Sequence, residues 1–583
     1  MRDPSPYVAL LVAIVPAALA QMSGIVRSES GPVSGATVRV ERTALAVTTG
    51  RDGAFALPAA VSQSPLSLTA YAPGYYIAGP FRAQPGSAHI DILLKKHPER
   101  DHAGYEWVAA ASSAGREFNC QNCHADSGAK DSPLPFDEWL KDAHGTSVQS
   151  RRFLSMYNGT DLSGAHRSPP TPRGVHSEYG SFPLPPDLTK PYFGPGFKLD
   201  FPRSAGACAA CHAPAAAVAA PYGTDFNSVA GVGREGVTCD FCHKIWSVRL
   251  APSTGLPYPG MPGVLSIAFR RPPPGSQLFI GPYDDVAGED TYSPLQRRSQ
   301  ICAPCHYGQF WGVQVYNSFG EWLASSYADP VSGETCQDCH MPRRGSALVA
   351  RRDKGAGDRD PKTVYSHLMP GASDIALLRD TAVLRVNAQR AGSAIQVRVQ
   401  VTNARAGHHI PTDHPARNII LVVSATDATG HELRQLSGPV IPDWGGQGNE
   451  PADYAGRPGK IFAKVLEELW TGAAPTAAYW NPTRLREDTR LAAKATDTTD
   501  YQFAVSGNGG PVVVRATLVF RRAFRTLNRQ KGWDTPDVLM NEWHAQLLCG
   551  AKRRPTPASP GSPVARSKVP VRPRAAWSGW TRW

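Results

Sequence analysis

The segment GVTCDFCHKI spans residues 236–245 and places Cys239 and Cys242 on either side of two intervening residues, with His243 directly after the second cysteine. A CxxC pair alone could hold zinc, exchange disulfides or form a small covalent staple. The distinguishing feature is the histidine fused to the pair. Whether that arrangement recurs along the chain decides which chemistry the segment serves.

Ten of the eleven cysteines belong to five copies of this CxxCH pattern. The copies are CQNCH, CAACH, CDFCH, CAPCH and CQDCH. Two thiols at this spacing can add to the two vinyl groups of one porphyrin, and the adjacent histidine then lies beneath the iron as its proximal ligand. A zinc site would need paired CxxC units or histidines three to five residues away, and a dithiol redox centre needs one pair. The repetition therefore predicts five covalently attached c-type haems.

The predicted ligands follow directly from the motifs. The haem attachment residues are Cys120, Cys123, Cys208, Cys211, Cys239, Cys242, Cys302, Cys305, Cys336 and Cys339. The proximal iron ligands are His124, His212, His243, His306 and His340. Short intervals between Cys208 and Cys239, and between Cys302 and Cys336, predict two close haem pairs.

The N-terminus predicts export. Residues 1–20 combine an early arginine, an apolar run and small residues at the end, which is typical of a cleavable signal peptide. No other stretch reaches eighteen apolar residues, so we expect no transmembrane segment and a periplasmic or extracellular location. The net charge of +12 includes eight Lys and Arg in residues 550–583, and haem propionates would offset the rest. The charge therefore does not predict nucleic-acid binding.

Hydrophobic periodicity predicts a multidomain fold. Residues 21–97 contain short alternating strands separated by turns and predict a β-sandwich. Residues 98–372 contain all five motifs and predict a loop-rich and helical haem domain. Residues 373–549 predict a β-rich, sandwich-like domain that is interrupted by a helix at KIFAKVLEEL, residues 460–469, and that supplies a distal haem ligand. Residues 550–583 predict a disordered, basic, proline-rich tail.

Twelve of the seventeen histidines lie outside the motifs and could supply second axial ligands. One candidate ends the amphipathic segment FDEWLKDAH, and another lies in the polar loop NARAGHHIPTDHPARN, where the first histidine is preferred over the other two. The predicted distal ligands are His144, His408, His367 and His176. A weak repeat relates FDEWLKDAHG, residues 136–145, to FGEWLASSYA, residues 319–328, with a tyrosine where the first copy has its histidine.

Several of these segments resemble the multihaem cytochrome c superfamily, near the cytochromes that accept electrons from hydroxylamine oxidoreductase. The resemblance covers roughly residues 100–545 and rests on AGACAACHAPAA, EGVTCDFCHKI, ICAPCHYGQFWG and TCQDCHMP. It implies His144, His408 and His367 as distal ligands, through WLKDAH, GHHIPT and SHLMPG. In the second of these patterns Asp413 follows, where glycine is common in the family. Residues 21–97 similarly resemble carboxypeptidase-regulatory-like β-modules, which implies a role in adhesion or spacing.

The leading hypothesis is an exported pentahaem cytochrome that passes single electrons to redox protein partners or other cytochromes, with no catalytic residue assigned. One alternative is a multihaem redox enzyme that acts on a small nitrogen or sulfur compound at one open haem. A second alternative is a subunit of an extracellular cytochrome filament, in which self-assembly or a larger complex would extend the haem chain. Ammonia-forming nitrite reductases mark the open haem with lysine, whereas all five motifs here end in histidine.

Overall fold

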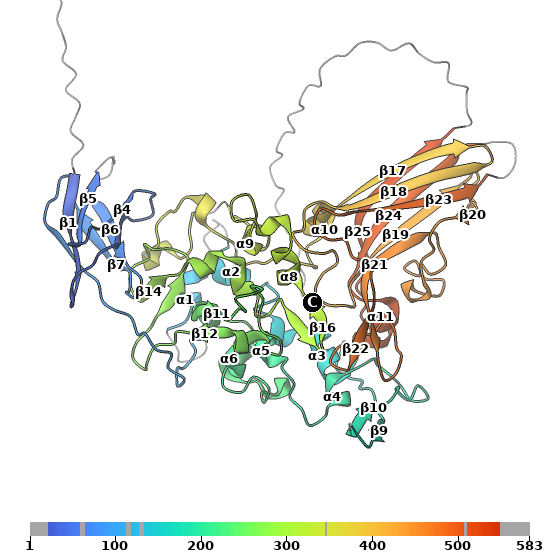
Figure 1. Cartoon of the computed structure of the whole chain (residues 1–583), viewed down its shortest axis with the longest axis horizontal. Coiled ribbons are helices and arrows are strands. Elements are labelled where there is room, and N and C mark those ends of the chain that lie inside the picture. Colours follow the sequence, from blue (N-terminus) through green and yellow to red (C-terminus); the bar gives the residue numbers. More distant parts are fainter. Residues whose placement is uncertain are drawn as a thin grey trace, which may run out of the picture.

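The computed structural model describes residues 21–58, 65–111, 118–126, 133–178, 180–343, 345, 347–505 and 510–548. Two β-rich domains flank a loop-rich central region (Figure 1). The expected signal peptide, the C-terminal tail and Cys549 lie outside the described residues. Among the helices of the described segments, none is long and apolar enough to cross a membrane.

The N-terminal domain consists of two four-stranded sheets that share a core. Alternating apolar residues explain each strand, since in β5 Phe55 and Leu57 are buried while their neighbours are exposed. One sheet has the order β2-β1-β5 with β8 pairing parallel to β1, and the other has the order β4-β3-β6-β7. The strands are β1 (Gln21–Ser28), β2 (Gly31–Pro32), β3 (Thr37–Val40), β4 (Ala46–Thr48), β5 (Ala54–Pro58), β6 (Leu66–Tyr71), β7 (Ala78–Ala83) and β8 (Ile90–Leu93).

The N-terminal domain is anchored to the central region around residues 277–292. The guanidinium of Arg39 forms an ion pair with Asp284 at 2.9 Å. The hydroxyl of Tyr71 donates to the carbonyl of Tyr292 at 3.0 Å. These contacts join segments more than two hundred residues apart in sequence, so the N-terminal domain packs against the central region.

Short helices and small sheets make up the central region, and its longest helix among the described residues is the eight-residue α3. The helices are α1 (Gln121–His124), α2 (Pro135–Trp139), α3 (Arg151–Asn158), α4 (Phe197–Asp200), α5 (Ala209–His212), α6 (Pro214–Ala217), α7 (Cys239–Cys242), α8 (Ser318–Leu323) and α9 (Cys336–His340). The strands form two-stranded sheets and are β9 (Arg173–His176), β10 (Gly180–Pro183), β11 (Ile245–Val248), β12 (Ile267–Phe269), β13 (Phe279–Gly281), β14 (Asp290–Tyr292), β15 (Gly308–Phe310) and β16 (Val313–Tyr316).

The C-terminal domain packs a four-stranded sheet, β17-β18-β23-β20, against a five-stranded sheet, β22-β21-β19-β24-β25. Inward-facing valine, isoleucine and leucine side chains from both sheets form its core. Its elements are α10 (Ile375–Thr381), β17 (Ala382–Ala391), β18 (Ala394–Asn403), β19 (Asn418–Thr426), β20 (Gln435–Ser437), β21 (Gly459–Glu468), β22 (Thr483–Asp488), β23 (Thr496–Ala504), β24 (Val512–Arg521), α11 (Arg525–Lys531) and β25 (Val538–Leu547).

The helix expected at residues 460–469 is wrong, because this segment is strand β21. The strand lies between β22 and β19, and both of its faces are covered. Consecutive side chains such as Ile461, Phe462 and Ala463 are each at most 5% exposed. A strand buried on both faces loses its alternation, and a continuous apolar run then fits a helix equally well.

Two segments of the C-terminal domain reach into the central region. One is the loop 404–417 between β18 and β19, and the other is the connection 469–482 between β21 and β22. The indole N–H of Trp480 donates to Asp200 at 2.6 Å.

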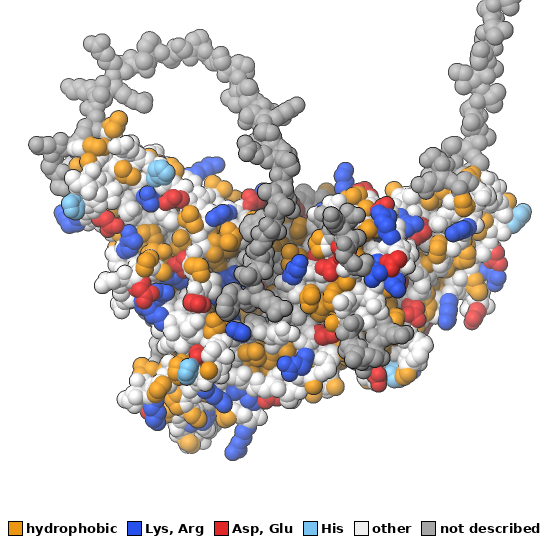
Figure 2. Space-filling view, turned by 180° about the vertical axis from the view of Figure 1, so that it is seen from behind, with side chains coloured by type: hydrophobic (Ala, Val, Ile, Leu, Met, Phe, Trp, Pro, Cys, Tyr) orange, Lys and Arg blue, Asp and Glu red, His pale blue; other side chains and the backbone are white. Residues whose placement is uncertain are grey.

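Seen from behind, the molecule presents Lys and Arg interspersed with Asp and Glu (Figure 2). This face therefore carries mixed charge.

Candidate haem-binding sites

Each CxxCH motif folds into a single helical turn. In four motifs the backbone N–H of the histidine donates to the carbonyl of the first cysteine, at 2.9 Å for CQNCH, 3.1 Å for CAACH, 3.0 Å for CDFCH and 3.0 Å for CAPCH. In the fifth motif the residues form α9. Positions i, i+3 and i+4 of a helical turn share one face, so both thiols and the imidazole point the same way. None of the ten motif cysteines forms a disulfide, and each residue is half-buried.

Polar caps stabilise the start of two of the five turns. The hydroxyl of Thr238 accepts from the N–H of Phe241 at the start of α7. Thr335 and Asp338 form a reciprocal capping box around α9. Such caps satisfy backbone donors that a single turn would leave unbonded.

Thiols of different motifs lie side by side, which places the five motifs in one connected series. The thiol of Cys302 interacts with that of Cys336. Cys239 contacts Cys120 of the first motif. Cys305, the second thiol of CAPCH, contacts Cys211 of CAACH and lies near the CDFCH motif. The short interval between Cys208 and Cys239 predicts that CAACH and CDFCH form a close pair. In the structure, Cys211 of CAACH contacts CAPCH, and Cys239 of CDFCH contacts CQNCH.

Three motif histidines are held by backbone carbonyls in the tautomer that metal binding requires. The Nδ1 atoms of His124, His243 and His340 lie 2.8, 2.9 and 2.6 Å from the carbonyl oxygens of Val349, Ile280 and Pro370. A carbonyl only accepts hydrogen bonds, so each Nδ1 carries the hydrogen and each Nε2 keeps its lone pair. The Nδ1 of His306 instead faces the carboxylate of Asp413 at 3.2 Å.

Two motif histidines face a second histidine at one common distance. The ring centroids of His306 and His144 are 6.2 Å apart, and those of His340 and His408 are also 6.2 Å apart. An imidazole nitrogen binds a metal at about 2.0–2.1 Å, and its ring centroid lies about 1.1 Å further, so two imidazoles across one metal ion stand roughly 6.3 Å apart. Each pair therefore has the spacing of two axial ligands on one haem iron.

The other predicted distal ligands lie elsewhere. The backbone N–H of His367 donates to Glu138 of α2 at 2.8 Å, which places its loop against the segment that carries His144. His176 lies on β9, in the hairpin with β10 at the lower edge of the molecule (Figure 1). Its Nδ1 accepts from the N–H of Glu178 at 3.2 Å, which leaves the hydrogen on Nε2. The structure thus brings together the predicted ligands of two haems, and the ligand roles of His367 and His176 stay predictions.

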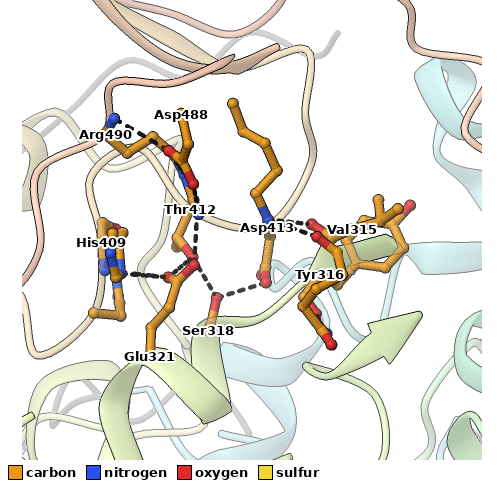
Figure 3. A network of polar contacts seen from close by, with 12 residues as sticks. Val315, Tyr316, Ser318, Glu321, His409, Thr412, Asp413, Asp488 and Arg490 are labelled. Atoms are coloured by element: carbon orange, nitrogen blue, oxygen red, sulfur yellow. Dashed lines mark hydrogen bonds and ion pairs between the residues drawn. The ribbon is translucent and has the colours of Figure 1, made fainter. Parts of the chain in front are cut away.

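A buried polar network positions the loop that carries His408 (Figure 3). One carboxylate oxygen of Glu321 accepts from the Thr412 hydroxyl at 2.7 Å and from the His409 N–H at 3.1 Å. Its other oxygen accepts from Arg490 at 2.6 Å, and Arg490 also pairs with Asp488 at 2.8 Å. Charges this deeply buried persist only when paired, so the network fixes the loop against α8.

The same network contains a buried lysine and the carboxylate that faces His306. Lys464, on β21, donates to the carbonyls of Gln314 and Val315 at 2.9 and 3.0 Å. Burial lowers the pKa of Lys464 to about 8, and the nearby guanidinium of Arg490 contributes. The Ser318 hydroxyl donates to Asp413 at 2.5 Å. Sequence patterns gave no sign of these partners, apart from the unusual aspartate after the GHHIPT segment.

The CAACH site has a different environment. The ring of Phe153 stacks on His212 with centroids 4.1 Å apart. Tyr316 and Tyr479 lie 5.2 Å apart near the motif thiols, and His414 lies 5.6 Å from Tyr479. Burial raises the pKa of both tyrosines and lowers that of His414 to about 3.

The neutral ring of His414 is oriented as a hydrogen-bond donor. Its Nδ1 accepts from the N–H of Ala416 at 3.2 Å, so its hydrogen lies on Nε2. This is the opposite tautomer to that of His124, His243 and His340. His414 and the two tyrosines therefore offer donors, and no free imidazole lone pair, beside the CAACH motif.

The residues present fit covalent haem. Two thiols without a disulfide and an imidazole share one face of each turn, hydrogen bonds orient four of the five imidazoles, and two sites hold a second imidazole at the separation that an iron atom needs. Within the described segments, no group of three or more His, Cys, Asp and Glu side chains converges as around a bare metal ion. A porphyrin supplies four of the six iron ligands, so a haem site needs only two from the protein.

Comparisons with known proteins give few relatives. No protein-family model and no curated protein matches this chain. One similar solved structure is a penta-haem cytochrome c552 from Thermochromatium tepidum, 21% identical over 73% of this chain and 97% of that chain, with a TM-score of 0.47. Another is the human CEP192 PapD-like domain 7, 7% identical over 30% of this chain and 87% of that chain, with a TM-score of 0.12. At these scores neither likeness establishes a shared fold.

Proposed function

We propose that this chain is an exported pentahaem c-type cytochrome that transfers single electrons through five covalently attached haems. The carrying observation is the pairing of His306 with His144 and of His340 with His408, each at 6.2 Å. Bound haem iron supplies one-electron chemistry, and two fixed axial ligands keep its coordination unchanged during transfer. The five motifs, CQNCH to CQDCH, supply the attachment residues.

The chain's own residues support electron transfer in three ways. The paired thiols hold each haem at a fixed place in the fold. The carbonyl and carboxylate acceptors on Nδ1 keep four of the five motif imidazoles from turning. The contacts Cys120–Cys239, Cys302–Cys336 and Cys211–Cys305 bring neighbouring motifs together. Redox protein partners or other cytochromes would exchange electrons at the ends of this series.

Haem content tests the proposal directly. The full chain is matured in a bacterium that attaches c-type haem, and its intact mass and haemochrome spectrum are measured. We expect five haem adducts and a mature N-terminus after residue 20. A variant with Cys549→Ala, outside the motifs, should keep all five, and a variant with both cysteines of one motif changed to alanine should lose one. Mature protein without tetrapyrrole adducts would refute the proposal.

A second candidate function, catalysis at one open haem, is favoured by the CAACH site. His414, Tyr316 and Tyr479 place buried donors beside this motif, where a small anion or hydroxylated nitrogen compound could accept their hydrogen bonds. Electron paramagnetic resonance of the oxidised protein tests this function. A high-spin fraction that changes when nitrite or hydroxylamine is added supports catalysis, and five low-spin haems unaffected by either compound exclude it.

A further inference from the structure

The two histidine pairs differ in the charge of their hydrogen-bond acceptors. In the CAPCH pair, the Nδ1 of His306 lies 3.2 Å from a carboxylate oxygen of Asp413, and the Nδ1 of His144 lies 2.7 Å from one of Asp142. In the CQDCH pair, both Nδ1 atoms face neutral backbone carbonyls, at 2.6 Å for His340 and 2.8 Å for His408. The two sites thus share one ring separation and differ in the charge around the rings.

Asp142 is built into its place. Its side chain is 3% exposed. One oxygen also accepts from the backbone N–H of His144 at 2.9 Å, and the other accepts from the N–H of Met369 at 3.1 Å. Three donors therefore hold the carboxylate against the imidazole, and each favours the anionic form.

Asp413 is held in its place against a backbone preference. Its φ angle is 59°, in the left-handed region that side chains other than Gly, Asn and Asp seldom adopt. Its second oxygen accepts from the Ser318 hydroxyl at 2.5 Å, and the nearby Arg417 favours its ionised form. A residue in this conformation points to a function, and here the conformation directs a carboxylate at His306.

An anionic acceptor on Nδ1–H increases the electron density that an imidazole donates to its metal. Negative charge near the iron also stabilises the oxidised, more positive state over the reduced state. Both effects lower the reduction potential, and the CAPCH site has a carboxylate on each side. The CQDCH site has a carbonyl on each side, so it lacks this contribution.

We propose that Asp142 and Asp413 make the CAPCH haem the lowest-potential haem of the protein. The inference rests on the proposed function. The CAPCH thiols contact those of CAACH and CQDCH and lie near CDFCH, so this haem occupies the junction of the series. Under partial reduction, electrons then reside on the outer haems and cross the junction without accumulating there.

The test is a spectroelectrochemical titration of the intact holoprotein, with electron paramagnetic resonance to identify each haem. The imidazole planes stand 62° apart in the CAPCH pair and 15° apart in the CQDCH pair, so the two ferric signals differ in rhombicity. We expect the CAPCH signal to disappear last on reduction. Asp413→Asn keeps a side chain that tolerates the left-handed backbone, and Asp142→Asn keeps its size.

Each substitution should raise the reduction potential of the CAPCH haem by at least about 59 mV. For one electron this shift changes the oxidised-to-reduced ratio tenfold at a fixed applied potential. The CQDCH haem in the same molecule is the internal control and should not move, and Asp329→Asn removes an exposed carboxylate that contacts neither histidine pair. A CAPCH haem that is reduced before the CQDCH haem, or that both substitutions leave unmoved, overturns the inference. Five adducts with unmoved potentials refute only this inference, whereas missing adducts refute the proposed function.

Discussion

Glu321 holds the loop that carries His408, so removing its charge tests the whole arrangement. Its carboxylate accepts from Arg490 at 2.6 Å, from Thr412 at 2.7 Å and from the His409 N–H at 3.1 Å. The Glu321 and Arg490 side chains are 2% and 6% exposed. In Glu321→Gln the single amide oxygen can accept either from the Arg490 guanidinium or from the Thr412 and His409 donors. The amide N–H groups then point at the donors that the oxygen does not reach, which leaves those donors without an acceptor.

The expected loss of unfolding free energy follows from these contacts. A hydrogen bond to a charged group contributes about 1.5–3 kcal/mol, and breaking a buried ion pair by removing one partner costs about 3–5 kcal/mol. Asp488 still pairs with Arg490 at 2.8 Å, which prevents a fully uncompensated charge. We therefore expect Glu321→Gln to lower the free energy of unfolding by about 2–3 kcal/mol, within the range for a hydrogen bond to a charged group and below that for a broken buried ion pair.

Urea unfolding of the holoprotein, followed by circular dichroism in the Soret band that the proposed haems would give, measures this loss. The matched control is Glu138→Gln in the first copy of the internal repeat, where the carboxylate accepts from a neutral backbone N–H at 2.8 Å. We expect a loss of about 1 kcal/mol there. A Glu321→Gln protein as stable as the wild type, or a control that loses as much, would refute the assigned role.

The same substitution has a pH signature. Burial alone would raise the pKa of Glu321, but Arg490 and the Thr412 hydroxyl hold it below its ordinary value of 4.5. A carboxyl whose pKa is lower in the folded state stabilises the protein above the pKa of the unfolded chain, and this contribution is lost as the pH falls through the folded value. Glu321→Gln should therefore be less sensitive to acid below pH 4.5 than the wild type.

Three further variants test other parts of the structure. Changing both Cys239 and Cys242 to alanine should leave four haem adducts of the five expected from the motifs, and a mass with all five would contradict covalent attachment at this turn. Burial lowers the pKa of Lys531 to about 7, so unfolding free energy should rise between pH 7 and 10 by up to about 1.4 kcal/mol per pH unit, and Lys531→Met should abolish that slope in urea titrations. Leu421→Ala, fully buried in the C-terminal core, should cost about 2–5 kcal/mol by the same assay while haem content stays at five, and a loss of haem would contradict separate roles for core and motifs.

The haem-attachment turns are predictable from the sequence because they depend on local residue spacing. The contacts that orient the histidines join distant residues and are not predictable from local patterns. The CxxCH spacing alone places two thiols and an imidazole on one face of a turn, as in α7. The hydrogen bond between His306 and Asp413 joins residues 107 positions apart, and no local pattern encodes it. The apolar run 460–469 predicts a helix and forms strand β21 instead, because burial on both faces removes the alternation that identifies a strand.

The weak sequence repeat corresponds to a repeated set of contacts. In the first copy the indole N–H of Trp139 donates to the carbonyl of Val237 at 2.8 Å, two residues before the CDFCH motif. In the second copy Trp322 donates to the carbonyl of Glu334 at 2.9 Å, two residues before CQDCH. Each short helix therefore fixes the start of a haem-attachment turn, which explains why the Phe-x-Glu-Trp pattern occurs in both copies.

The two copies differ at the position where the first has a histidine that faces a motif histidine. The first copy continues to His144, which faces His306, whereas the second copy has the buried Tyr327 at the matching place. A Cβ atom on Gly407 would lie 3.0 Å from the ring of Tyr327, so the tyrosine packs directly against the loop that precedes His408. Because the second copy uses this position for packing, the imidazole opposite His340 comes from the C-terminal domain. Under the proposed function the C-terminal domain would supply the second imidazole of the CQDCH site, and removing it should leave His340 without a facing histidine.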